Sequence, residues 1–225
     1  MTVEQGAQDA ARRIVLFDFD GVLVRGDTFA MFMRDHYARA RWRKGLVLLL
    51  SPWLMLVLPF SRRRVLRSIV HLGLLGLNEA RYRKLAQAFA TALVRQPGHF
   101  CREGLAVLRR HQAAGDRIVI VTGCEESLAR SVLAELGVDN VEVLASRLRA
   151  GSLGMRSEWH NIGRRKVELL AQHGIEACHV AYSDSNQDLP MLALAAEAVL
   201  VNATPKLCKR VEKALARSIT RAEWY

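Results

Sequence analysis

The chain has 225 residues, of which 51% are hydrophobic and 24% are charged. This length and composition exclude a globally disordered chain and suit one domain, or one domain that carries an inserted subdomain. Lysine and arginine number 33 against 22 acidic residues, which gives a net charge of +11. Such a charge favours anionic partners: nucleic acid, phospholipid head groups or phosphorylated metabolites.

Residues 1–13 and the cysteines predict where the protein resides. Residues 1–13 are polar and lack the apolar core of a secretory signal, so we expect the N-terminus to stay in the cytoplasm. The cysteines are far apart and form no CxxC pair, which argues against a zinc site and favours a reducing compartment. They are Cys101, Cys124, Cys178 and Cys208.

Short apolar runs that end in polar residues predict the strands of a buried parallel sheet. The clearest cover residues 13–17, 117–121, 178–182 and 198–201, and a weaker one covers 141–144. Helical stretches at 102–114, 127–136 and 165–173 alternate with these runs, and glycine, the usual helix stop, follows each. This alternation predicts an α/β fold with a doubly wound, Rossmann-like parallel sheet.

The segment from 27 to 96 interrupts this alternation. It contains no convincing strand, and residues 79–94 have the periodicity of a helix. We therefore expect an α-helical cap at 27–96, inserted into a core formed by 13–26 and 97–205. Residues 206–225 are expected to form a basic C-terminal helix.

Polar and charged residues gather where the predicted strands end. In a doubly wound sheet, ligands bind beyond the carboxyl ends of the strands. Several carboxylates close together repel one another, and Mg²⁺ together with a lysine ammonium would relieve that repulsion and create a site for a phosphoryl group. The residues expected there are Asp18, Asp20, Thr122, Gly123, Lys166, Asp184 and Asp188.

This ordered set of motifs resembles the haloacid dehalogenase superfamily, specifically its phosphoserine phosphatase-like phosphatases with a helical cap. The matching segments are Asp18-Phe19-Asp20-Gly21-Val22, Val121-Thr122-Gly123, Lys166, and the run from Ser183 to Asp188. They span roughly residues 13–25 and 97–202. One position departs from the pattern, because Val22 stands where many relatives have threonine.

The resemblance implies three catalytic residues. Asp18 would be the nucleophile that forms an aspartyl-phosphate, which divides one hard hydrolysis into two easier steps. Asp20 would protonate the leaving alcohol and then activate the attacking water. Lys166 would neutralise charge at the nucleophile and the phosphate, and Asp188 would support it by orienting Lys166 or a metal-bound water.

The resemblance also implies the ligands of a cofactor and a substrate. Mg²⁺ would be held by Asp18, the backbone carbonyl of Asp20, and Asp184. Thr122 and the amide of Gly123 would bind phosphate oxygens. The expected cofactor is therefore Mg²⁺ and the expected partner is a phosphorylated substrate.

The predicted cap contains an apolar segment with basic flanks. Residues 46–60 carry no charge, and Arg39, Arg41, Arg43 and Lys44 precede them while Arg62, Arg63, Arg64 and Arg67 follow. A helix of this run would reach about 22 Å, short of the ~30 Å hydrocarbon core of a bilayer.

The sheet also requires the chain to return to the side from which it left, which excludes a single crossing. We expect an interfacial or re-entrant hairpin with Pro52 near the bend, Val65–Leu77 as the return segment, and Trp42 and Trp53 at head-group level. The alternative is a hydrophobic helix buried within the cap or in a dimer interface.

Four segments carry a second resemblance: residues 27–34, the leucine- and proline-rich run that follows them, residues 61–64, and residues 182–190. They resemble the bacterial phosphatidylglycerophosphatase C family. This resemblance implies dephosphorylation of phosphatidylglycerophosphate to phosphatidylglycerol on the cytoplasmic side of the inner membrane, at an anionic membrane surface. One alternative is a cytoplasmic, soluble phosphatase similar to phosphoserine phosphatase. Another is a non-catalytic basic adaptor that binds membranes. The sequence lacks the aromatic-basic pattern of nucleic-acid modules, so no nucleic-acid partner is expected, and it leaves the oligomeric state open.

Overall fold

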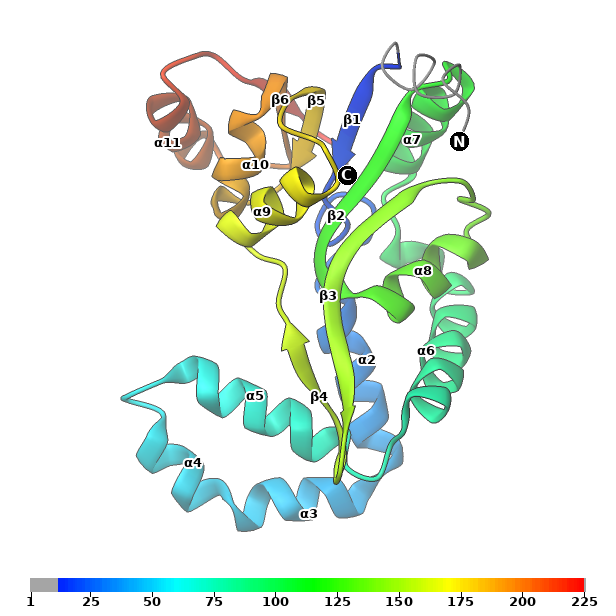
Figure 1. Cartoon of the computed structure of the whole chain (residues 1–225), viewed down its shortest axis with the longest axis vertical. Coiled ribbons are helices and arrows are strands. Elements are labelled where there is room, and N and C mark those ends of the chain that lie inside the picture. The colour runs from blue at the N-terminus through cyan, green and yellow to red at the C-terminus, as the bar shows by residue number, and fades with distance from the viewer. Residues whose placement is uncertain (1–11, 225) are drawn as a thin grey trace.

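A seven-stranded sheet forms the centre of the molecule (Figure 1). The computed structural model describes residues 12–224. The strands lie in the order β4-β3-β2-β1-β5-β6-β7, and every neighbouring pair is parallel except β3 and β4. The predicted α/β fold class is confirmed. The strands are β1 (Ile14–Phe17), β2 (Arg117–Glu125), β3 (Glu142–Gly151), β4 (Gly154–Trp159), β5 (Cys178–Ser183), β6 (Ala195–Val201) and β7 (Thr220–Ala222).

Helices cover both faces of the sheet, so the central strands are apolar on both sides. In β1, Val15 and Phe17 belong to one buried apolar cluster and Leu16 to the other, because successive side chains point to opposite faces. The first cluster packs under α7 (Arg102–Ala113) and α8 (Glu126–Glu135). The second packs under α9 (Arg164–Gln172), α10 (Leu189–Ala193) and α11 (Pro205–Leu215).

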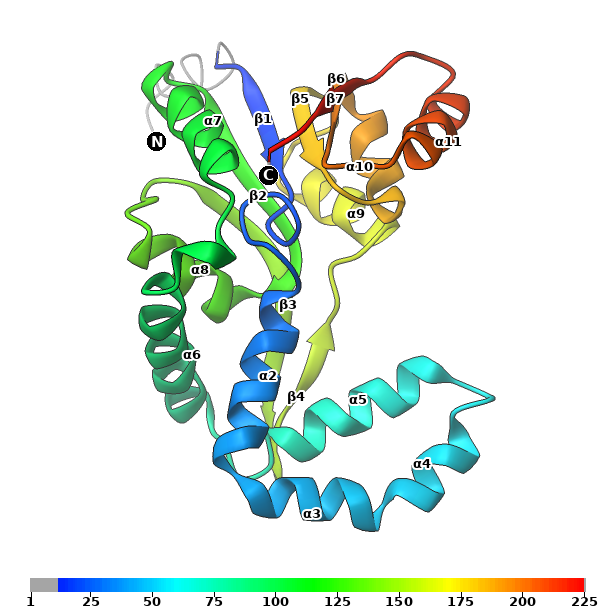
Figure 2. The same ribbon diagram turned by 180° about the vertical axis from the view of Figure 1, so that it is seen from behind.

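The chain between β1 and β2 forms a helical insertion beyond the carboxyl ends of the parallel strands (Figures 1 and 2). Asp27, Ser61 and Asn78 begin three of its helices by accepting a hydrogen bond from the backbone N–H three residues on. Helix α6 has the predicted bounds. The helices are α2 (Thr28–Arg39), α3 (Arg41–Leu49), α4 (Ser51–Val57), α5 (Arg62–Gly73) and α6 (Glu79–Val94), followed by the short 3-10 helix η1 (Pro97–His99).

The uncharged run 46–60 is divided between α3, α4 and the turn after α4. Pro52 lies in the first turn of α4, where a missing N–H costs little, so it does not mark the reversal. The chain instead reverses in the turn that contains Pro59, and α5 forms the return segment (Figure 1). Among the described residues, no helix combines the length and apolarity needed to cross a bilayer.

Strands β3 and β4 form an antiparallel ribbon, of which the sequence predicted only the start of β3, at 141–144. The ribbon leaves the sheet beside β2 and reaches the base of α5 (Figure 1). There His71 Nδ1 lies 3.1 Å from the carbonyl oxygen of Met155, and the N–H of Gly76 donates to the carbonyl oxygen of Leu153 at 2.9 Å. Gly154 has φ +142° at this contact, and a Cβ there would collide with the backbone of residues 74–76.

The C-terminal segment differs from its prediction, and most of the N-terminal segment lies outside the described residues. Residues 206–225 were predicted to be one helix, but α11 ends at Leu215 and Ala216 adopts a left-handed conformation with φ 52°. The chain then adds β7 to the edge of the sheet beside β6. Of the polar segment 1–13, expected to contain no secretory signal, only Arg12 and Arg13 lie within the described residues.

Candidate active site

Three neighbouring strands bring predicted site residues together at the carboxyl ends of the parallel strands. Asp18 follows β1, Thr122 lies in β2 and Asp184 follows β5, and β1 lies between the other two strands. The chain continues from β1 towards β2 on one side and later returns to β5 on the other. Such a switch in strand order leaves room for a ligand at the carboxyl ends.

Asp18 is a buried carboxylate with two cationic or polar contacts. Its Oδ1 accepts a hydrogen bond from the N–H of Phe19 at 2.7 Å and lies 3.1 Å from Lys166 Nζ. Burial is the main cause that raises the pKa of Asp18 well above its ordinary value, and the nearby carboxylates of Asp188 and Asp184 raise it further. Lys166 opposes this shift without cancelling it.

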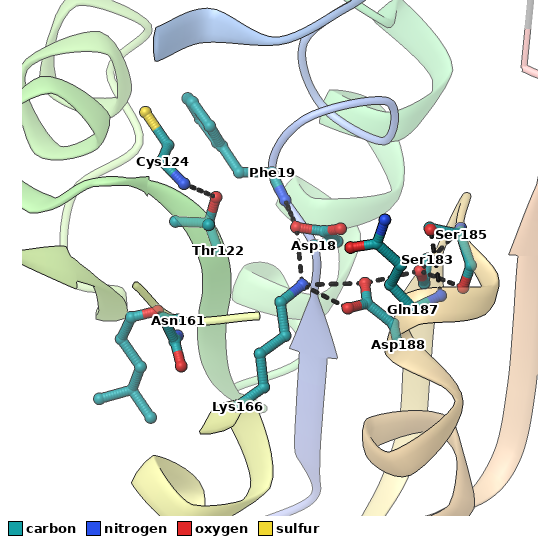
Figure 3. A network of polar contacts seen from close by, with 12 residues as sticks. Asp18, Phe19, Thr122, Cys124, Asn161, Lys166, Ser183, Ser185, Gln187 and Asp188 are labelled. Carbon is teal, nitrogen blue, oxygen red and sulfur yellow. Dashed lines mark hydrogen bonds and ion pairs between the residues drawn. The ribbon is translucent and has the colours of Figure 1, made fainter. Parts of the chain in front are cut away.

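Lys166 lies in the first turn of α9 and is clamped between two carboxylates (Figure 3). Its Nζ is 2.8 Å from each carboxylate oxygen of Asp188, and the hydroxyl of Ser183 donates to Asp188 Oδ2 at 2.8 Å. Burial alone lowers the pKa of Lys166, but the carboxylates of Asp18 and Asp188 outweigh it and the net shift is upward. Burial raises the pKa of Asp188, but the charge of Lys166 and the hydrogen bonds to Asp188 together outweigh burial, and the net shift is downward.

Asp20 lies in the tight turn after β1 and faces the start of α2. Its Oδ1 accepts hydrogen bonds from the N–H and the hydroxyl of Thr28 at 2.9 and 2.5 Å. Burial raises the pKa of Asp20 to about 6, although the two bonds from Thr28 oppose the rise. A carboxyl with this pKa is suited to both donating and accepting a proton near neutral pH.

Asp184 lies against Gly21 of the same turn. Gly21 has φ +78°, and a Cβ on it would overlap the carboxylate of Asp184, so only glycine permits this approach. Burial, followed by the charge of Asp188, raises the pKa of Asp184. Between residues 12 and 224 no group of three or more His, Cys, Asp or Glu side chains has metal-binding geometry. The predicted magnesium site requires only two carboxylates and one backbone carbonyl.

The predicted phosphate-binding pair is supported by residues that the sequence analysis missed. Thr122 is fully buried, and its Oγ1 accepts from the N–H of Cys124 at 2.9 Å. The carbonyl of Gly123 accepts from the hydroxyl of Ser146 at 2.6 Å, and that hydroxyl accepts from the N–H of Asn161 at 2.9 Å. Asn161 therefore fixes the loop before Lys166 against β2 and β3.

The structure thus brings Asp18, Lys166 and Asp188 into direct contact, with Asp184 near them. Asp20 faces Thr28, and no sequence motif predicts this contact. Val22, the departure from the expected pattern, is fully buried in the apolar cluster that contains Phe17. The site therefore contains four carboxylates but only one lysine in ion-pair contact with them among the described residues.

Comparison with known proteins gives the family. The model of the haloacid dehalogenase-like hydrolase family matches residues 15–193. The chain belongs to this family. It is 30% identical over 203 residues to the protein CicA of Caulobacter vibrioides (strain NA1000 / CB15N), covering 88% of each chain. The protein is therefore a hydrolase of the haloacid dehalogenase type.

Solved structures show the same fold. A protein of unknown function from Bordetella pertussis Tohama I superposes with a TM-score of 0.69 at 20% identity, covering 93% of this chain and 98% of that one. A phospho-aspartyl intermediate analogue of phosphoserine phosphatase superposes with a TM-score of 0.51 at 17% identity, covering 89% and 90%. The fold of this hydrolase is thus shared with phosphatases.

Proposed function

We propose that this protein is a Mg²⁺-dependent phosphomonoester hydrolase that works through an aspartyl-phosphate on Asp18. The observation that carries the proposal is the buried contact of Asp18 with Lys166 at 3.1 Å, beside a second carboxyl, Asp20, whose pKa is about 6. A nucleophile held by a cation, next to a group able to exchange protons, is what a two-step phosphoryl transfer requires. A non-catalytic adaptor would need neither arrangement.

The donor set fits a magnesium ion. Asp18, the backbone carbonyl of Asp20, and Asp184 offer the hard oxygen ligands that Mg²⁺ prefers. Burial raises the pKa of Asp18 and Asp184, a shift that a bound cation would oppose, and Gly21 gives Asp184 room at the turn. When bound, the ion supplies positive charge that stabilises the phosphoryl oxygens in the transition state.

The residues then divide the reaction into two balanced steps. The carboxylate of Asp18 forms a bond to phosphorus while the bond from phosphorus to the alcohol oxygen breaks, and Asp20 gives its proton to that oxygen. Asp20 next takes a proton from water, the water oxygen attacks phosphorus, and the bond to Asp18 breaks to release phosphate. Lys166 holds Asp18 in place throughout, and Asp188 with Ser183 holds Lys166.

Thr122 and the amide of Gly123 are proposed to bind the phosphate oxygens from the β2 side of the site. Thr122 Oγ1 already accepts from Cys124, so its hydroxyl hydrogen remains to be donated. The network from Ser146 and Asn161 holds the Gly123 peptide at a fixed position. A preorganised donor at this place stabilises charge without reorganisation during the reaction.

The proposed substrate is phosphatidylglycerophosphate, dephosphorylated on the cytoplasmic side of the inner membrane. The observation that supports a lipid over a small polar ester is the set of exposed apolar side chains of α3 and α4. A soluble, phosphoserine phosphatase-like enzyme would not need such a surface. The choice of this particular lipid rests on the sequence resemblance alone. Because the fold is shared with phosphoserine phosphatase, the test also includes phosphoserine as a substrate.

The test measures phosphate release from phosphatidylglycerophosphate, phosphatidic acid and phosphoserine with and without Mg²⁺. We expect Mg²⁺-dependent turnover that is highest on phosphatidylglycerophosphate. In Asp18→Asn, turnover is expected to fall by at least about a thousandfold while circular dichroism stays that of the wild type. Full activity of Asp18→Asn would refute the nucleophile, and a preference for phosphoserine would refute the lipid substrate.

A further inference from the structure

The helical insertion carries a large apolar surface that none of the residues from 12 to 224 covers. Of the eleven large hydrophobic side chains that are exposed among residues 12–224, ten lie between Trp42 and Leu66. Phe60 is 85% exposed, Leu49 75% and Leu56 69%. We call these ten residues the docking surface: Trp42, Leu48, Leu49, Leu50, Trp53, Met55, Leu56, Leu58, Phe60 and Leu66.

This exposure remains after the helices have packed against one another. Leu54 of α4 and Val65 of α5 are buried, and α5 contacts both α3 and α4. Met55 and Leu56, directly after Leu54, are exposed. The hairpin formed by α3, α4 and α5 therefore has an inner apolar side that is buried and an outer apolar side that is exposed to solvent. Contiguous exposed apolar surfaces are rare on proteins without a partner.

The charge of the same segment restricts the partner. Between His36 and Asn78 the sequence contains eight lysine and arginine residues and no aspartate or glutamate. Lys44, Arg62, Arg64 and Arg67 are exposed, the last three at the start of α5, directly after Phe60. A partner must therefore offer apolar material and negative charge together. The interface of an anionic bilayer, with acyl chains under anionic head groups, has both properties.

A second copy of this chain fits the surface poorly. In a symmetric dimer the same patch meets itself, so two strongly basic surfaces would face each other. The segment from His36 to Asn78 holds no acidic side chain to pair with them. Apolar contact between two copies would thus be opposed by repulsion, whereas an anionic bilayer benefits from both contributions.

The base of the hairpin is fixed to the rest of the molecule, so the surface has a defined orientation. Within the insertion, Arg43 donates to the carbonyl of Leu75 at 2.8 Å. At the contact with the β3–β4 ribbon, the N–H of Gly76 donates to the carbonyl of Leu153 at 2.9 Å. Helix α5 also contacts β4. Because the helices lie beyond the carboxyl ends of the strands, the surface is on the same end of the molecule as the candidate active site (Figure 1).

We propose that the docking surface binds an anionic lipid bilayer by inserting α3, α4 and the turn at Pro59 into the head-group region, without spanning the membrane. The proposal deepens the proposed function by naming the partner of the helical insertion, and it rests on that function only for the identity of the substrate. Trp42 and Trp53 lie at the interface, a depth that tryptophan prefers. The arginines at the start of α5 contact lipid phosphates.

The experiment is flotation with vesicles of phosphatidylglycerol and phosphatidylethanolamine, compared with vesicles of phosphatidylcholine alone. The wild type is expected to float with the anionic vesicles and much less with the neutral ones. Leu49→Glu/Leu56→Glu is expected to weaken binding on the order of a hundredfold, since two leucines can no longer be buried. Ala88→Glu/Ala134→Glu, which adds the same charge at exposed positions of α6 and α8, is expected to bind like the wild type.

A second variant tests the charges. Arg62→Gln/Arg64→Gln/Arg67→Gln is expected to lose about fivefold in affinity for each arginine on anionic vesicles, and to change little on neutral ones. Circular dichroism confirms that each variant is folded. Lack of flotation of the wild type with anionic vesicles overturns the proposal. So does a dimer in sedimentation that Leu49→Glu/Leu56→Glu dissociates, because a second copy would then occupy the surface.

Hydrolysis of phosphatidylglycerophosphate dispersed in detergent, and of a soluble phosphomonoester, both measured with the wild type and without vesicles, separates this proposal from the proposed function. Flotation without any hydrolysis supports docking and contradicts the phosphatase. Hydrolysis without flotation supports the phosphatase and contradicts docking. The two proposals therefore fail independently.

Discussion

Thr28, the first residue of α2, donates two hydrogen bonds to one carboxylate oxygen of Asp20, from its N–H at 2.9 Å and from its hydroxyl at 2.5 Å. The helical insertion thus begins on the residue that holds the proposed acid. Both bonds favour the ionised carboxylate and so oppose the effect of burial on the pKa of Asp20, which is about 6.

Thr28→Val is expected to raise the pKa of Asp20 further, because a bond to its ionised form is lost. The kcat/KM of the wild type should decline above about pH 6, where the acid loses its proton, and this decline should move to higher pH in the variant. We also expect turnover to fall roughly ten- to a hundredfold, because the carboxyl is less well positioned. Thr28→Ser, which keeps the hydroxyl, should match the wild-type pH profile. An unchanged profile in Thr28→Val would show that the hydroxyl does not tune Asp20.

Lys166→Ala is expected to cost both stability and activity. The substitution leaves Asp18 and Asp188 buried without their cation, and breaking a buried ion pair in this way costs about 3–5 kcal/mol. For a chain of this size that corresponds to a Tm lower by about 6–20 °C. Differential scanning calorimetry measures the loss. Lys166→Arg keeps the charge and should lose less stability, so an equal loss in both variants would contradict the ion-pair explanation.

Magnesium is expected to stabilise the wild-type protein through Asp184. At a hundred times its Kd, a ligand that binds only the folded state adds about 2.7 kcal/mol, a Tm increase of about 5–10 °C here. Asp184→Asn should abolish this increase. Without Mg²⁺ the variant should melt at the wild-type temperature or above it, because burial disfavours the ionised carboxylate. Thermal melts with Mg²⁺ and with a chelator check both expectations, and a persistent Mg²⁺ effect would remove Asp184 from the ligand set.

Gly21→Ala should weaken magnesium binding without removing any ligand. A Cβ at this residue would displace the carboxylate of Asp184, and φ +78° strains any residue that has a Cβ. We expect the Mg²⁺ concentration for half-maximal activity to rise at least about tenfold. Gly26→Ala is the matched control, since its φ is +95° but its Cβ would meet nothing within 4 Å. Equal effects of both substitutions would attribute the loss to backbone strain alone.

The parts of the fold that were predictable are those where burial is complete. The β1 run is apolar on both faces and is followed by Asp18, so both the strand and its carboxyl end could be identified. Of the β3–β4 ribbon, only the start of β3 was predicted, as the weaker strand at 141–144. The rest was missed because much of it is exposed and carries residues such as Arg149 and Arg156, which give no apolar pattern. Strand β7 has three residues, too few for any periodicity.

The candidate site shows the same division. Asp18, Asp20 and Asp184 were found because they stand at strand ends, where topology alone brings them together. The roles of Thr28 and Asn161 depend on contacts with residues distant in the sequence. The residues next to them in the sequence give no sign of these contacts. Asn161, for example, is recognised only through its bonds to Ser146 and to the carbonyl of Leu144. Side-chain partnerships across the fold are not encoded in local spacing.

The ribbon fixes the α5 side of the helical insertion to the core, while α6 is fixed on the other side by its packing against α8. Helix α6 is held against the core by the hydroxyl of Tyr82, which donates to Glu125 at 2.7 Å, and by Gln87, which donates to Glu135 at 2.7 Å. Bonds from residues 71–76 to Leu153 and Met155 prevent α5 from moving relative to the sheet unless β3 and β4 bend with it. A displacement of α5 relative to the sheet would therefore deform the same strands that lead to Asn161 and α9, so a ligand that presses on this helix would strain the support of Lys166.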